Sequence, residues 1–135
     1  MLNTETVTAA QMVAEARARI ENLSPEQVIA ETASRRPLLV DIREPEERVQ
    51  TGAISGSVHA PRGMLEFYAD PTSPYHRAEF DPTHRTILYC ASGGRSALAA
   101  DTLRRLGYAN VAHLDGGIKG WIAAGNDIAR EIGRS

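Results

Sequence analysis

The apolar positions of the chain fall into short continuous runs and into helical stripes. Mostly apolar runs, typical of buried parallel strands, occupy residues 38–42, 86–90 and 111–114, and residues 54–59 are expected to form another short strand. Segments with helical features lie before, between and after these strands, at residues 9–23, 24–36, 45–50, 63–69, 96–106 and 117–124. Strands that alternate with helices predict an α/β fold with a central parallel sheet flanked by helices on both faces.

Two of the expected helices precede the first strand. Val13, Ala16, Ile20 and Leu23 recur at spacings of three and four, which predicts an extra N-terminal amphipathic helix over residues 9–23. Such a stripe packs either on its own domain, which we expect here, or on a partner helix in a dimer. The second helix begins at the N-cap residue Ser24, and Gln27 completes a capping box with it.

The composition narrows the functional class. A length of 135 residues suits one domain, and 42% hydrophobic with 24% charged residues is typical of a water-soluble globular protein. A net charge of −2 gives no support to a nucleic-acid or membrane partner. The N-terminus lacks the basic region and apolar core of a signal peptide, and the single cysteine fits a reducing compartment. We therefore expect a cytoplasmic protein.

The one cysteine, Cys90, lies where a strand run meets a helical segment. The residues from Cys90 to Arg95, called here the cysteine loop, include Gly93 and Gly94. Backbone N–H groups of such a turn can point inward, and the following helix adds its positive N-terminal end. With the guanidinium of Arg95, these features favour the thiolate of Cys90. A buried structural thiol is the alternative, but it would not require two glycines and an arginine behind it.

Metal chemistry finds little support. His59, His76, His84 and His113 are scattered, and no pair of them has zinc-ligand spacing with Cys90. We expect no metal and no other cofactor.

The chain resembles the single-domain rhodanese family of sulfurtransferases in four stretches, which occur in the family's order. These are residues 39–47, 52–61, 90–96 and 115–121. One departure is Ala53, where the family usually has histidine, and we expect a structural adjustment there. The resemblance implies a rhodanese-like domain over residues 38–125, a helical extension over residues 1–37 and a C-terminal tail over residues 126–135.

The resemblance also implies a two-step reaction. Cys90 would attack the outer sulfur of an anionic donor such as thiosulfate, sulfite would leave, and Cys90 would hold a persulfide. An external acceptor, either cyanide or a thiol that could belong to another protein, would then remove the sulfur. Asp41 and Arg43 are expected as an ion pair or loop brace near the site. The residues expected to bind the donor are Ala91, Ser92, Gly93, Gly94, Arg95 and Ser96.

Two other functions remain open at this stage. Related phosphatases and arsenate reductases also use a cysteine loop, but five residues separate their cysteine from the arginine, whereas four separate Cys90 from Arg95. The tighter loop suits a single sulfur atom better than a tetrahedral phosphate. A non-catalytic binding or regulatory module is the second alternative, although the retained cysteine favours an enzyme.

The long segment over residues 64–85 carries Phe67, Tyr68, Tyr75 and Phe80. These aromatic residues form either a rim over the cysteine loop or a satellite cluster that holds the segment in place.

Overall fold

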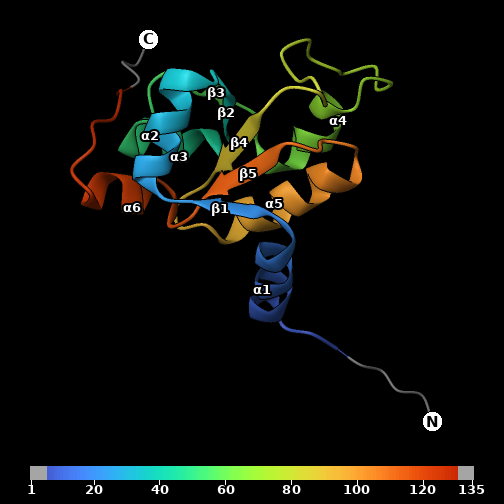
Figure 1. Ribbon diagram of the computed structural model, residues 1–135, viewed down its shortest axis with the longest axis horizontal. Coiled ribbons are helices and arrows are strands. Elements are labelled where there is room, and N and C mark those ends of the chain that lie inside the picture. Colours follow the sequence, from blue (N-terminus) through green and yellow to red (C-terminus); the bar gives the residue numbers. More distant parts are fainter. Residues whose placement is uncertain (1–5, 131–135) are drawn as a thin grey trace.

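The computed structural model of the chain describes residues 6–130 and has a parallel five-stranded sheet between two layers of helices (Figure 1). The strand order is β1-β5-β4-β2-β3, so β4 lies at the centre. The strands are β1 (Glu21–Leu23), β2 (Leu38–Asp41), β3 (Val58–His59), β4 (Thr86–Tyr89) and β5 (Val111–Leu114). The α/β prediction with a central parallel sheet is confirmed.

Helices cover both faces of the sheet. They are α1 (Ala9–Arg19), α2 (Pro25–Ser34), α3 (Pro45–Thr51), α4 (Leu65–Ala69), α5 (Gly94–Arg105), α6 (Gly117–Ala123) and a 3₁₀ turn, η1 (Arg62–Met64). Residues of α4 and α5 pack with one set of strand side chains, and residues of α2 and α6 pack with the alternate set. This division follows from the alternation of side chains along each buried strand.

The first helix is shorter than the sequence predicts. It ends at Arg19, the backbone of Ile20 is extended, and β1 pairs with β5 at the edge of the sheet. The prediction of one helix over residues 9–23 is therefore wrong beyond Arg19. Ile20 packs against one core cluster and Leu23 against the other, on opposite faces of the sheet, so their spacing only imitates a helical stripe.

The remaining part of α1 packs against α5, as expected for a helix that serves its own domain. Ala16 is buried in this contact, and Arg19 pairs with Asp101 of α5 at 2.8 Å. The expected capping box of α2 is present, with Ser24 and Gln27 bonded reciprocally.

Other element boundaries also differ. The strand expected over residues 54–59 is reduced to β3, because Ile54 and Ser57 close a turn and Ala53 bridges to Ala129 instead. The helix expected over residues 63–69 begins with η1. Helix α5 begins two residues before the expected position 96, since Gly93 takes the left-handed conformation that starts it.

The aromatic residues of segment 64–85 divide into two groups. Phe80 is buried and Tyr68 packs against the same cluster, which is one of the two main cores of the domain and not a satellite. Phe67 and Tyr75 are exposed and form an edge-to-face pair with ring centroids 6.4 Å apart.

Candidate active site at the carboxyl end of β4

The sulfur of Cys90 lies at the carboxyl end of the central strand, where it is almost completely buried. Its side chain is 1% exposed. The N–H groups of Gly93 and Ser96 donate to the sulfur at 3.2 and 3.3 Å. Both groups belong to the start of α5, whose dipole is positive at this end. The arrangement stabilises negative charge on the sulfur.

The cysteine loop is held from behind by the start of α6. The N–H groups of Ile118 and Lys119 donate to the carbonyl oxygens of Cys90 and Ala91 at 2.9 and 3.0 Å. Gly117 has a φ of +63° and lies so close to the loop that an added Cβ would be 2.6 Å from the oxygen of Cys90. Only glycine fits this contact, which lets α6 bind the two loop carbonyl groups.

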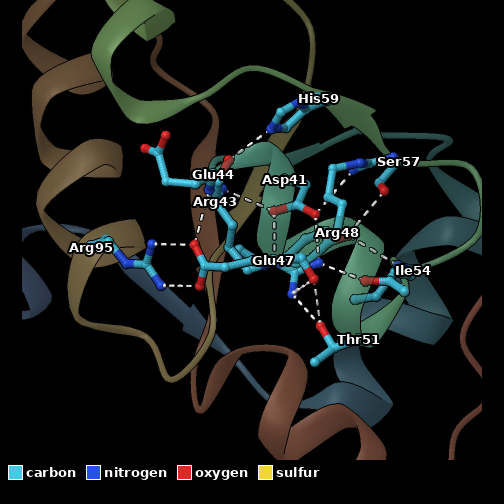
Figure 2. Close-up of polar contacts among 12 residues, drawn as sticks. Asp41, Arg43, Glu44, Glu47, Arg48, Thr51, Ile54, Ser57, His59 and Arg95 are labelled. Carbon is cyan, nitrogen blue, oxygen red and sulfur yellow. Dashed lines mark hydrogen bonds and ion pairs between the residues drawn. The ribbon is translucent and has the colours of Figure 1, made fainter. Parts of the chain in front are cut away.

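Arg95 does not lie against the sulfur but forms a bidentate ion pair with Glu47, at 2.9 and 3.0 Å (Figure 2). The hydrogen bonds from Arg95 lower the pKa of Glu47 to about 2, so this carboxylate is ionised at neutral pH. The same pair raises the pKa of Arg95. The side chain of Arg95 is 42% exposed.

Asp41 and Arg43 form a buried ion pair at 2.8 Å that braces the turn after β2 (Figure 2). Arg43 also donates to the carbonyl oxygen of Gly52 at 2.7 Å, and Arg48 donates to Asp41 at 3.0 Å. Burial alone would raise the pKa of Asp41, but the hydrogen bonds from Arg43 outweigh it and the pKa is lowered. The brace fixes the start of α3, which carries Glu47.

The other residues expected at the site lie around the loop. Ser92 is exposed, Gly94 is half-buried, and Ala91 lines a cavity of about 200 Å³ together with residues of α3 and α6. Ser96 is buried, with its hydroxyl oxygen 3.5 Å from the sulfur. Within residues 6–130, the hydrogen-bond partners of the sulfur are Gly93 and Ser96.

Sequence reasoning missed Glu47 and His113. Glu47 completes a capping box with Glu44. This pattern, which follows the end of a neighbouring strand, was the one sequence signal that could have placed Glu47 near the site. His113 hydrogen-bonds to Ser96, and nothing in the sequence distinguishes it from the other histidines.

No group of three or more His, Cys, Asp or Glu side chains between residues 6 and 130 is arranged to hold a metal ion. Over the same residues, every helix is too short or too polar to span a bilayer.

Comparison with known families decides the assignment. The sequence model of the Rhodanese-like domain family matches residues 24–124. The chain belongs to the rhodanese-like family. The resemblance in the four sequence stretches is thereby confirmed.

Individual rhodanese-like relatives extend this result. A Schizosaccharomyces pombe protein named "Putative thiosulfate sulfurtransferase, mitochondrial" is 33% identical over 99 residues, which cover 67% of this chain and 66% of that protein. The next two curated relatives are matched over 44% and 62% of their own lengths. The chain therefore spans about two thirds or less of these relatives.

Two solved structures match more of the chain than these curated relatives do. A protein of unknown function from Rhodopseudomonas palustris CGA009, described as a possible tyrosine phosphatase, has a TM-score of 0.86 and 42% identity, covering 95% of this chain and 98% of that one. The polysulfide-sulfur transferase homodimer of Wolinella succinogenes has a TM-score of 0.72 and 28% identity, with 90% and 86% coverage. Both structures share the fold of this chain, and the one from Wolinella succinogenes is named as a sulfur transferase.

Proposed function

We propose that this rhodanese-like protein is a sulfurtransferase that carries a sulfane sulfur on Cys90. The observation that supports the proposal most directly is the pair of N–H groups, from Gly93 and Ser96, that donate to a buried sulfur at the start of α5. A structural thiol has no need of two backbone donors. A nucleophilic thiolate and the persulfide that replaces it both carry negative charge, and both are stabilised by such donors.

The proposed reaction has two steps. The Cys90 thiolate attacks the outer sulfur of an anionic donor such as thiosulfate, so a Cys90 S–S bond forms. The bond from that sulfur to the sulfonate sulfur breaks, and sulfite leaves with the electron pair. An external nucleophile then attacks the outer sulfur and releases the Cys90 thiolate. With one cysteine in the chain, no internal thiol can take the sulfur. A protein thiol as acceptor and a cytoplasmic location stay predictions.

The similar Rhodopseudomonas structure is described as a possible tyrosine phosphatase. Phosphate hydrolysis is therefore the enzyme activity to test against sulfur transfer. One feature of this chain opposes it. Four residues separate Cys90 from Arg95, whereas the phosphatases have five, and the tighter loop suits a single sulfur atom better than a tetrahedral phosphate. A binding module without turnover is the other alternative.

Intact mass spectrometry after thiosulfate treatment tests the proposal directly. We expect the mass to increase by one sulfur atom and to return to the starting value when cyanide or a small thiol is added. An aryl phosphate assay on the same preparation should show essentially no hydrolysis. Hydrolysis faster than sulfur transfer would overturn the assignment, and a thiosulfate-treated protein of unchanged mass would favour the binding module.

The Arg95–Glu47 pair leads to a second prediction. An anionic donor must compete with Glu47 for the guanidinium, so Glu47→Gln should lower the KM for thiosulfate about tenfold, a change of ~1.4 kcal/mol. Glutamine keeps an oxygen that can accept the N–H of Glu44, so the capping box survives. Steady-state kinetics with thiosulfate and cyanide measures the effect.

Glu46→Gln provides the matched control for this experiment. It removes the same charge from the same turn of α3, and its exposed side chain is not a partner of Arg95. An equal fall in KM for both variants would show that only the net charge matters and that the ion pair does not govern donor binding.

A further inference from the structure

A chain of hydrogen bonds runs from the buried sulfur to the edge of the sheet. The Ser96 hydroxyl oxygen lies 3.5 Å from the Cys90 sulfur and 2.8 Å from His113 Nδ1. On the other side of the ring, His113 Nε2 lies 2.8 Å from Asn22 Oδ1. His113 is fully buried in β5, whereas Asn22 lies exposed in the edge strand β1. Three side chains therefore connect the sulfur to the surface.

The direction of each hydrogen bond follows from Asn22. Its amide nitrogen donates to the carbonyl oxygens of Arg17 and Ile20 at 3.0 and 3.2 Å, so only its oxygen faces His113. That oxygen requires a proton on Nε2 of the ring. Burial lowers the pKa of His113 to about 4, so the ring is neutral at physiological pH and Nδ1 is a bare acceptor.

Ser96 has one hydroxyl proton, and two acceptors face it, the carbonyl oxygen of Gly93 at 3.3 Å and His113 Nδ1 at 2.8 Å. The shorter contact directs the proton to His113. The lone pairs of the Ser96 oxygen are then left for the sulfur. The two other groups on the sulfur, the N–H of Gly93 and the N–H of Ser96, are donors and cannot accept a proton. Cys90 is 1% exposed, so water has little access to its thiol. Among the described residues, Ser96 is the one whose oxygen can accept the thiol proton.

We propose that Ser96 and His113 take up the Cys90 thiol proton as the sulfur attacks, and that Asn22 is a positioning residue that keeps His113 Nδ1 free to accept it. The inference rests on the proposed function of Cys90. In the step, the S–H bond breaks as an O–H bond forms on Ser96, while the original Ser96 O–H bond breaks as an N–H bond forms at His113 Nδ1. The sulfur keeps the electron pair, so a thiolate and an imidazolium replace two neutral groups.

The charges near His113 fit a transient imidazolium rather than a stable one. Burial is the largest influence and opposes the charged ring. Asp115 favours the charged ring, and Arg17 disfavours it while pairing with Asp115 at 2.5 and 2.8 Å. The ring therefore holds the proton only while the sulfur attacks, and returns it through Ser96 when the Cys90 thiolate is released.

Asn22, at the outer end of this hydrogen-bond chain, lies outside the region that the family model matches. The match begins at residue 24, whereas Asn22 lies in β1 and is held by the carbonyl oxygen of Arg17 in α1. Helix α1 is also seated beside the cysteine loop, since a Cβ on Gly94 would lie 3.9 Å from Val13. The N-terminal segment thus completes the site in this chain.

The test measures the rate at which thiosulfate loads Cys90, by quenched mass spectrometry of the full chain. Asn22→Ala should slow loading about tenfold, below the 10²–10⁴-fold range for loss of a direct acid–base group. Asn22→Asp keeps an oxygen for Nε2–H and should restore most of the rate. Arg19→Ala, which breaks the exposed pair between α1 and Asp101 without touching the hydrogen-bond chain, should load like the parent.

Nitrogen NMR of the imidazole rings supplies a second readout. His113, identified by its loss in His113→Gln, should carry its proton on Nε2 in the parent and should show a mixture of tautomers in Asn22→Ala. Parent-like loading by Asn22→Ala, equal slowing by Arg19→Ala, or a protonated Nδ1 in the resting parent would each overturn the inference. A parent that never gains sulfur would instead refute the proposed function.

Discussion

Replacing Cys90 with serine is expected to abolish sulfur transfer and leave the fold intact. Cys90 is the only thiol in the chain, and a serine hydroxyl is a far weaker nucleophile at neutral pH. The N–H groups of Gly93 and Ser96 can donate to a hydroxyl oxygen as they do to the sulfur, so the loop keeps its hydrogen bonds. Thiocyanate formation from thiosulfate and cyanide measures the activity, and circular dichroism reports the fold.

The parent protein is the reference for this variant. Measurable turnover by Cys90→Ser would mean that sulfur moves without a persulfide on this residue. If the parent and Cys90→Ser are equally inactive while both are folded, the domain acts as a binding module and the enzymatic proposal fails.

The second large effect is expected from Gly117→Ala. An added Cβ would collide with the carbonyl groups of Cys90 and Ala91, and φ at this position is +63°, which alanine adopts only under strain. The strain should lower the free energy of unfolding by about 1–3 kcal/mol. Displacing the loop by about 1 Å should also reduce sulfur transfer roughly a hundredfold. Thermal unfolding and thiocyanate formation measure the two effects.

Gly56→Ala separates the collision from the backbone strain. Gly56 also has a positive φ, +85°, but nothing lies within 4 Å of the position that a Cβ would occupy. This variant should lose some stability and keep its activity. If Gly117→Ala retains full sulfur transfer, the start of α6 does not hold the cysteine loop in its working geometry.

The sequence alone predicts much of the architecture because the signals are local. The buried strands β2, β4 and β5 read as apolar runs, and the cap at Ser24 is a pattern of neighbouring residues. The same local reasoning fails at residues 20–23. There, Ile20 and Leu23 are apolar because each packs on a different face of the sheet. This becomes clear only when β1 is seen to pair with β5.

The candidate site shows more clearly that local signals cannot identify contacts between residues far apart in the sequence. A short motif predicts that Cys90 lies between a strand and a helix, and the structure has β4 before it and α5 after it. The partner of Arg95 is 48 residues away in sequence, and Asn22, one of the two partners of His113, is 91 residues away from it. Such pairs depend on which strand ends meet, so no periodicity or spacing in the chain could have identified them. The division of the chain at residues 37 and 125 stays a prediction.

The burial of the Cys90 sulfur has a consequence for the regiochemistry of sulfur release. A persulfide offers an acceptor thiolate two electrophilic atoms, and attack at the inner one would leave the protein as a dead-end mixed disulfide. The inner sulfur is 1% exposed and enclosed by the loop, whereas the outer sulfur extends about 2 Å further along the S–S bond. In the proposed reaction, attack would thereby be directed to the outer atom, and each transfer would regenerate the Cys90 thiolate.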